Sequence, residues 1–296
     1  MKNRYDYICE EVQQAKDSRC SNPSGELLFY YRGHSDIDWD LVPTIIRSRR
    51  KVTEHSEICR AMNDGNWSLA DSAFVNIARM QHYGYATRFL DYSTSLDVAL
   101  YFACNDSNYY HRDGCISICP YTNDRHIETP DTLAISELAL LTSDISLMDF
   151  AKSVIEKHER AIKKENKLYK TPSFLFDEST DMAWAATVWL NSGFMITPTE
   201  DELNYLAKSN PRILRKKGAF FIFGNETTPS KVPTRSSLLD TVMIHPIIKE
   251  KSNLIRPDIL GNGAINITIR SRWKPEIMKM LEKKGITHEY LFPDEQ

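Results

Sequence analysis

Hydrophobic residues recur at helical spacing in several parts of the chain. Residues 2–17 show the pattern clearly, because apolar side chains stand about one turn apart at Tyr5, Ile8, Cys9, Val12 and Ala15. The same spacing predicts further helices, which are one or two over 53–82, an apolar helix over 96–104 and an amphipathic helix over 273–284.

Short apolar and aromatic runs predict the strands. They lie at 27–31, 115–119, 218–223, 266–269 and 290–292. The first run stops at Arg32, and the last follows Glu289 directly. Residues 225–233 are rich in Pro, Ser and Thr, which is typical of a loop.

The order of these elements predicts an α+β fold. Strands and helices interleave without regular βαβ alternation, and the sequence contains no internal repeat. No change of composition divides the chain, so we expect one domain over 1–296 with a mainly helical insertion near 120–212. Within it, the charged stretch 156–170 is expected to be a solvated helix face.

Composition and charge narrow the class of protein. Of 296 residues, 42% are hydrophobic and 26% charged, which excludes a disordered or low-complexity protein. The net charge of −3 gives no global electrostatic reason to bind nucleic acid or membranes. With 11 glycines, the chain falls below the usual ~7%, which argues against repeated glycine-rich phosphate loops.

Targeting signals and metal sites are not indicated. The chain has no apolar stretch of about 18 residues that could cross a bilayer, and residues 1–8 lack the apolar core of a signal peptide. Cys115 and Cys119 could form half of a metal site, but no second pair follows at a suitable spacing. We therefore expect a cytoplasmic protein without a metal, whose six cysteines are reduced.

The first candidate for chemistry is Arg32, at the end of the apolar strand 27–31. A guanidinium held at a strand edge can bind phosphate through two parallel hydrogen bonds, and Gly33 would let a ligand approach the backbone. The structural alternative is an ion pair between Arg32 and one of the carboxylates of Asp36, Asp38 and Asp40.

Polar residues also gather before helix 96–104. They are His82, Arg88, Asp91, Ser93, Thr94 and Ser95. One hydroxyl group is expected to cap the helix, but capping does not explain all three together. A buried His82 could equally be a satisfied core residue.

Glu289 is the third candidate, although a carboxylate before a short strand is by itself typical of a surface residue. The chain contains no G-x-S-x-G, H-E-x-x-H, P-loop or G-x-G-x-x-G pattern. A hydrolase triad is therefore not indicated.

Several of these segments together resemble the FRG domain family, which is named for a Phe-Arg-Gly motif. Tyr31, Arg32 and Gly33 correspond to that motif, with tyrosine in place of phenylalanine. The segments 80–84, 87–91 and 99–103 form the most specific part of the resemblance, which extends from about 27 to 294. Later segments at 212–213, 218–220 and 291–294 also fit, whereas Lys217 stands where the family often has glutamine.

The order of three motifs is also similar to that of the Arg-Ser-Glu class of ADP-ribosyltransferases. The motifs are Arg32 on an early strand, Ser93-Thr94-Ser95 before a helix, and Glu289 before a late strand. That class has Glu-x-Glu at the third motif, and Thr287 here replaces the first glutamate, which helps to select the acceptor. The resemblance implies an ADP-ribosyltransferase-like split β-sheet core with flanking helices.

The same resemblance implies roles for individual residues, with NAD as substrate and no metal. Arg32 would bind the phosphate or ribose of NAD. Ser93 and Ser95 would hold the nicotinamide ribose, with Thr94 supporting the turn. Glu289 would accept from the ribose 2′-hydroxyl and stabilise the oxocarbenium-like state. The remaining candidates for binding NAD are Tyr31, Gly33 and His82, and an aromatic ring of Tyr31, Tyr92 or Phe102 could stack on nicotinamide or belong to the core.

The resemblance therefore implies a NAD-dependent ADP-ribosyltransferase that modifies a macromolecular acceptor, either protein or nucleic acid. Such an enzyme would be a bacterial toxin or antiphage effector, with an antitoxin or regulatory protein as partner. Two alternatives remain open: a non-catalytic module that holds a nucleotide or partner, and a NAD glycohydrolase with water as acceptor. Thr287 and the unpaired Glu289 favour the non-catalytic module, whereas the order of the three motifs favours the transferase.

Overall fold

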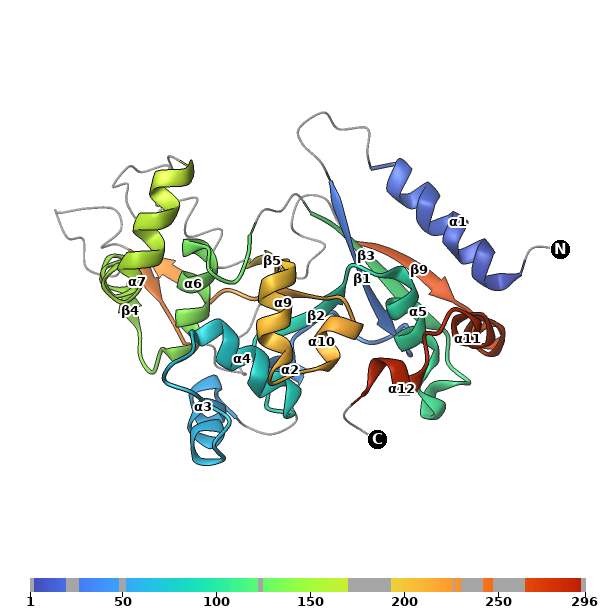
Figure 1. The fold of residues 1–296 in the computed structure, drawn as a ribbon, viewed down its shortest axis with the longest axis horizontal. Coiled ribbons are helices and arrows are strands. Elements are labelled where there is room, and N and C mark those ends of the chain that lie inside the picture. Colours follow the sequence, from blue (N-terminus) through green and yellow to red (C-terminus); the bar gives the residue numbers. More distant parts are fainter. Residues whose placement is uncertain are drawn as a thin grey trace.

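Helices surround an antiparallel sheet in the computed structural model (Figure 1). The structure describes residues 3–19, 27–47, 52–121, 125–169, 193–225, 227–229, 242–246 and 264–293. The arrangement is a mixed α+β fold, which confirms the fold class predicted from the sequence.

The main sheet has six strands in the order β5-β6-β2-β1-β3-β9. Their bounds are β1 (Leu28–His34), β2 (Phe89–Ser93), β3 (Gly114–Tyr121), β5 (Phe194–Ile196), β6 (Gly218–Ile222) and β9 (Ile265–Ile269). All neighbouring pairs are antiparallel. A small second sheet contains β4 (Ile145–Ser146), β8 (Val242–Ile244) and β7 (Thr227–Pro229).

The main sheet divides between β1 and β2. These two strands share the single register pair Tyr31↔Ser93. By contrast, β1 pairs with β3 at seven positions and β2 pairs with β6 at five. Two three-stranded halves therefore meet near Tyr31, and beyond it the edge of β1 that faces β2 has no strand partner among the described residues.

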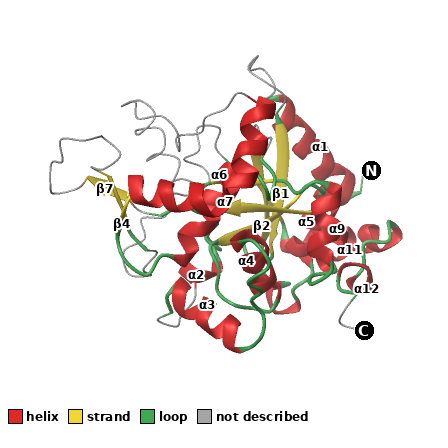
Figure 2. Cartoon of the chain, turned by 60° about the vertical axis from the view of Figure 1, so that its left-hand side comes forward, coloured by secondary structure: helices red, strands yellow, loops and turns green. Residues whose placement is uncertain are grey.

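Each half of the sheet has its own helices, as Figures 1 and 2 show. The half with β1, β3 and β9 packs against α1 (Arg4–Asp17), α5 (Leu96–Cys104) and α11 (Lys274–Lys283). The half with β2, β5 and β6 packs against α4 (Ala73–His82), α6 (Pro130–Glu137), α7 (Leu147–Tyr169) and α9 (Glu200–Ala207). The remaining helices are α2 (Thr44–Arg47), α3 (Glu54–Asn63), α10 (Arg212–Arg215) and α12 (His288–Leu291).

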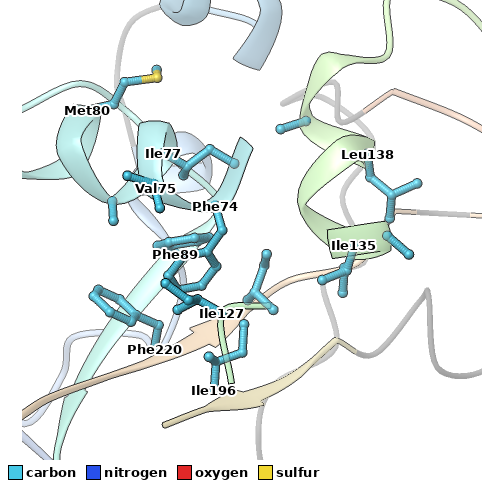
Figure 3. Close-up of a cluster of buried hydrophobic side chains, with 14 of the residues drawn as sticks. Phe74, Val75, Ile77, Met80, Phe89, Ile127, Ile135, Leu138, Ile196 and Phe220 are labelled. Atoms are coloured by element: carbon cyan, nitrogen blue, oxygen red, sulfur yellow. The ribbon is translucent and has the colours of Figure 1, made fainter. Parts of the chain in front are cut away.

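The hydrophobic core follows the same division. In the cluster of Figure 3, Phe74 from α4 contacts Phe89 of β2 and Phe220 of β6, with ring centroids 4.9 and 5.6 Å away. A second cluster contains Tyr31 together with residues of α5, β3 and β9. Tyr31 pairs with Ser93, so the two side chains point to the same face of the sheet. Phe89 lies four residues before Ser93 on β2 and shares that face, because side chains alternate along a strand. The two clusters therefore cover one face of the sheet. Polar residues of β2 interrupt this face between them.

The structure confirms most of the predicted elements and corrects three of them. The helices over 2–17, 53–82, 96–104 and 273–284 are present, as are the strands over 27–31, 115–119, 218–223 and 266–269. The first strand continues through Arg32 and Gly33 to His34, since β3 pairs with it over its whole length. Within the expected loop 225–233, residues 227–229 form β7.

The most consequential correction concerns the expected strand at 290–292. Tyr290 and Leu291 belong to the short helix α12 instead, and Phe292 is its C-cap. The helix begins here because Thr287 is its N-cap, and the Thr287 hydroxyl accepts from the Tyr290 amide at 3.2 Å. Glu289 therefore lies in the first turn of a helix and does not precede a strand.

The expected insertion near 120–212 contains α6, α7 and α9, but it also supplies β5 to the main sheet. Residues 170–192 of that segment lie outside the described residues. No helix in the described part of the chain is both long and apolar enough to span a bilayer.

Candidate functional site

A cavity of about 310 Å³ lies where the two halves of the sheet separate. Its volume is within the range of small-molecule sites. The wall comes from β1, β2 and β6, from the end of α4, from α5, and from α10 with its flanking residues. The lining residues used below are Tyr31, Arg32, Gly33, Gln81, His82, Asp91, Tyr92, Ser93, Phe102, Arg212 and Lys216.

Strand periodicity explains why polar groups meet in this cavity. Successive side chains of a strand point to opposite faces, so Asp91 and Ser93 share the face that carries Phe89. Their register partners on β6 are Phe220 and Gly218. A carboxylate and a hydroxyl therefore lie on the face that the helices cover, at the gap between the two core clusters.

Arg32 spans the split in the sheet. Its Nη1 donates to the carbonyl oxygen of Asp91 at 2.5 Å, and its Nε donates to Nε2 of His34 at 2.8 Å. Burial lowers the pKa of Arg32, while the nearby Asp91 carboxylate favours the charged form. The guanidinium thus satisfies a backbone group that a neighbouring strand would otherwise satisfy, and it still lines the cavity.

Two of the three carboxylates that could pair with Arg32 have another partner. Asp36 and Asp38 instead form salt bridges with Arg112. The Arg112 guanidinium lowers the pKa of Asp36 accordingly. No salt bridge from Arg32 to a carboxylate occurs in the described residues.

His34 is neutral in this environment. Burial, together with the charges of Arg32 and Arg47, lowers the pKa of His34 to about 3. Since Nε2 accepts from Arg32, the ring proton belongs on Nδ1. The histidine therefore orients the guanidinium and adds no charge to it.

We expect His34→Gln to weaken the acid sensitivity of the fold. An unfolded chain takes up a proton at His34 below pH 6.5, whereas the folded chain takes it up only near pH 3. The unfolded state therefore binds more protons in this window, and the free energy of unfolding falls as the pH falls from 6.5 toward 3. At about 1.4 kcal/mol per pH unit, this loss is about 2 kcal/mol at pH 5. Urea unfolding at pH 7 and pH 5 measures it.

Glutamine at position 34 can still accept from Arg32 but does not titrate, so the variant should lack this part of the pH dependence. The control is His111→Gln, since His111 is exposed. Equal pH dependence in wild type and His34→Gln would show that His34 is not buried in its neutral form.

Asp91 is the carboxylate of the cavity, and two other side chains fix its position. The amide of Gln81 donates from Nε2 to Oδ1 of Asp91 at 2.6 Å. The hydroxyl of Thr87 donates to Oε1 of Gln81 at 2.9 Å, which sets the orientation of the amide. The Asp91 side chain remains exposed at the cavity, so it is both oriented and accessible.

The three consecutive hydroxyl residues have different environments. Ser93 is buried and lines the cavity, and its Oγ donates to the carbonyl oxygen of Lys216 at 2.7 Å and accepts from the Ser95 amide at 2.9 Å. Ser95 is the N-cap of α5 but makes no side-chain capping bond. Neither Thr94 nor Ser95 is part of the cavity wall. Ser93 therefore ties β2 to the segment after α10 and starts the turn into α5.

Gly33 has a packing role that differs from the expected one. A Cβ atom at this position would lie 1.8 Å from the carbonyl oxygen of Ala99 and 2.7 Å from the amide nitrogen of Ala103. The glycine thus lets α5 approach β1 closely. The structure gives this reason for the glycine, although Gly33 also lines the cavity.

The cavity wall carries further cations. Arg212 and Lys216 come from α10 and its C-terminal end, and both cations lie over the ring of Phe292, at 5.1 and 4.2 Å from its centroid. His82, at the C-terminal end of α4, is half-buried and also lines the cavity. Arg32, Arg212 and Lys216 thus place three cations in a wall whose carboxylate is that of Asp91. This excess of positive charge favours an anionic ligand.

Glu289 does not belong to this cavity wall. It is exposed in the first turn of α12, where hydrogen bonds from its own backbone amide and from the Thr287 hydroxyl lower the pKa of its carboxyl. Phe292, which directly follows α12, packs against the cavity-lining residues Phe102 and Lys216. The structure thus brings together Tyr31, Arg32, Gly33, His82 and Ser93, but not Thr94, Ser95 or Glu289.

Sequence reasoning did not assign roles to Asp91, Gln81, Arg212 or Lys216. The spacing of Asp91 and Ser93 could have indicated that Asp91 belongs to the site, because residues two apart in a strand share a face. Lys216 lies 123 residues from Ser93, and no local pattern brings these positions together.

The two cysteines with a spacing that could suit a metal lie in one strand. Cys115 and Cys119 are buried in β3, and burial raises the pKa of Cys115 to about 11 and that of Cys119 to about 12. Their thiols are therefore protonated at neutral pH. Across the described ranges, no group of three or more His, Cys, Asp or Glu side chains could hold a metal ion.

Comparison with known proteins agrees with part of the sequence interpretation. The family model of the FRG domain matches residues 28–112. This range begins with β1 and includes Arg32, Asp91, Ser93 and α5, but it ends before α10 and α12. No curated protein and no solved structure matches the chain.

Proposed function

We propose that the cavity binds NAD and that the protein transfers ADP-ribose from NAD to a nucleophile on a macromolecule. One observation carries the proposal: the split between β1 and β2 gathers Arg32, Asp91 and Ser93 around a single cavity. A resemblance to the Arg-Ser-Glu transferases supports it, since such enzymes have a split sheet with an arginine on an early strand.

The groups in the cavity fit the parts of NAD. The guanidiniums of Arg32 and Arg212 and the ammonium of Lys216 suit the two phosphates. The rings of Tyr31, Tyr92 and Phe102 supply flat apolar surface for nicotinamide.

The chemistry requires a negative group beside the departing nicotinamide. The bond between the ribose C1′ and the nicotinamide nitrogen breaks, and nicotinamide leaves with the electron pair. The acceptor nucleophile then bonds to C1′ and releases its proton. A carboxylate stabilises the positive ribose in between. Because Asp91 is the carboxylate in the wall and Glu289 is not, we assign this role to Asp91.

A non-catalytic nucleotide-binding module is the second candidate. It is favoured by the position of Glu289 outside the cavity wall and by the structural hydrogen bonds of Ser93. A NAD glycohydrolase would use the same cavity with water as acceptor. The three functions differ in the product formed from NAD. The transferase gives a modified macromolecule, the glycohydrolase gives free ADP-ribose, and the binding module gives no product.

The test combines binding and transfer. Purified protein is titrated with NAD by calorimetry, and separately incubated with NAD labelled in the ADP-ribose part and cell extract. We expect Arg32→Ala to weaken NAD binding by about 10- to 100-fold, because one charge-assisted hydrogen-bonding group contributes about 1.5–3 kcal/mol. Arg272→Ala is the matched control, since Arg272 is exposed and lies outside the cavity wall.

Each outcome identifies a function. Labelled protein or nucleic acid supports the transferase, and free ADP-ribose without labelling supports the glycohydrolase. Binding that depends on Arg32 without any turnover supports the module. Wild type that does not bind NAD would exclude all three as NAD-dependent functions.

We also propose that the transferase is a toxin or antiphage effector held in check by an antitoxin or another regulatory protein. This proposal rests on the family resemblance alone. Expression of wild type in bacteria should then slow growth, and variants that lose transfer should not. Growth unaffected by an active enzyme would exclude toxicity by itself.

A further inference from the structure

A second cavity, of about 450 Å³, adjoins the first. The two share Arg32, Gly33 and Phe102, so Arg32 stands between them. The second cavity extends beyond Tyr31 along the edge of β1 that faces β2, which has no strand partner there among the described residues, toward α2 and the C-terminal end of α5. Trp39 and Arg47 are among the residues that line the second cavity and not the first.

Two guanidiniums face this second cavity. Burial lowers the pKa of Arg47 and of Arg32, and the charge of Arg47 lowers the pKa of Arg32 further. Neither guanidinium forms a salt bridge with a carboxylate in the described part of the chain. Among the described residues, the Arg47 guanidinium donates one long hydrogen bond, of 3.3 Å, to the Thr44 hydroxyl. Two neighbouring cations repel each other, and an anion that lies between them stabilises both.

Asp106 does not neutralise this pair. Its carboxylate also lines the second cavity, but its Oδ1 accepts at 3.0 Å from the Asn108 amide in the short 3-10 helix η1 (Ser107–Tyr109). The charge of the Asp91 carboxylate partly offsets the lowering of the pKa of Arg32 and of Arg47.

The second cavity also has an aromatic wall. Trp39 is 37% exposed, and its ring packs edge-on against Tyr109 with centroids 4.8 Å apart. On another side its centroid lies 6.3 Å from the neutral ring of His34. These two contacts hold the indole in place while leaving part of it open to the cavity.

We propose that this second cavity binds a nucleoside monophosphate group, with the phosphate between Arg32 and Arg47 and the base against Trp39. Two guanidiniums suit a phosphate, and an exposed indole suits a planar base. A simple anion would leave the aromatic wall unused. The proposal goes beyond the proposed function, because it requires no bond of the ligand to break.

Such a group could come from two sources. It could be the adenosine half of a dinucleotide that passes Arg32 from the first cavity, or a nucleotide of a nucleic-acid acceptor. Both sources present the same phosphate and base, so binding of AMP tests the site itself. NAD and a short 5′-phosphorylated oligonucleotide then distinguish the sources.

The experiment measures AMP binding to the full chain by calorimetry. Arg47→Ala and Trp39→Ala should each weaken AMP binding by about tenfold or more, and Arg47→Lys should weaken it less because it keeps the charge. Adenosine and inorganic phosphate should each bind more weakly than AMP. Arg272→Ala and Tyr110→Ala are matched controls, because both side chains are exposed and lie outside both cavities. Circular dichroism verifies that each variant folds.

The two sources give different secondary results. If Arg47→Ala also weakens NAD binding, the second cavity holds the adenosine half of the dinucleotide. If NAD binding is unchanged but the oligonucleotide binds less tightly, it holds the acceptor. Wild type that fails to bind AMP, or AMP affinity unchanged in folded Arg47→Ala and Trp39→Ala, would overturn the proposal. AMP binding with no NAD turnover would support the site while the transferase function fails.

Discussion

Asp91→Asn is expected to lower the rate of ADP-ribose transfer by about 100-fold or more while leaving NAD affinity nearly unchanged. Removing one group that stabilises charge in a transition state commonly has an effect of this size. Asparagine can still accept from Gln81 Nε2, so the hydrogen bond that positions residue 91 persists. Only the negative charge is lost. The rate is measured at saturating NAD, so that binding does not contribute.

Glu289→Gln is the matched variant for this test. It removes a carboxylate from α12, outside the cavity wall, and should change the rate by less than about twofold. The opposite result, with Glu289→Gln inactive and Asp91→Asn active, would contradict the assignment to Asp91 and return the role to the residue that the motif order indicates. Helix α12 would then have to reach the cavity during the reaction.

The sequence predicted the elements of the fold where the pattern was long enough to be distinctive. Helix α5 and strand β6 are examples, since an apolar run of seven residues at 98–104 and a run of five at 218–222 give different signals. At 290–292, three apolar residues fit either a strand or a helix. The decisive interaction is the Thr287 cap, and a single hydroxyl before a four-residue helix gives only a weak signal.

The sequence predicted those residues of the candidate site that belong to local motifs, and it did not predict those that reach the site through strand order. Arg32 and Ser93 belong to neighbouring strands, and their motifs are local in the sequence. Arg212 and Lys216 reach the cavity only because β6 pairs with β2 and places α10 beside it. Strand order is set by packing of the whole chain, so a single sequence without structural information does not reveal these neighbours.

Arg88→Ala is expected to lower the free energy of unfolding by about 3–5 kcal/mol, because it leaves the buried carboxylate of Glu54 without its counter-charge. The Arg88 side chain is completely buried. Its Nε and Nη2 donate to Glu54, and its Nη1 donates to the carbonyl oxygen of Phe223 at 3.1 Å and to Asn225 Oδ1 at 2.8 Å. Urea unfolding followed by circular dichroism measures the loss.

Two further variants test whether the expected loss of stability comes from breaking a buried ion pair and not from removing a charge as such. Arg112→Ala breaks the salt bridges to the buried Asp36 and the exposed Asp38, and because the Arg112 side chain is itself 42% exposed it should cost less than about 1 kcal/mol. The double variant Glu54→Ala/Arg88→Ala should lose less unfolding free energy than the sum of the losses of the two single variants. Each single variant leaves one buried charge without its partner, whereas the double variant removes both charges. Additive losses would show that the two side chains act independently. Because Arg88 directly precedes β2, which carries Asp91 and Ser93, a large loss would also mean that this pair helps to hold the cavity wall in place.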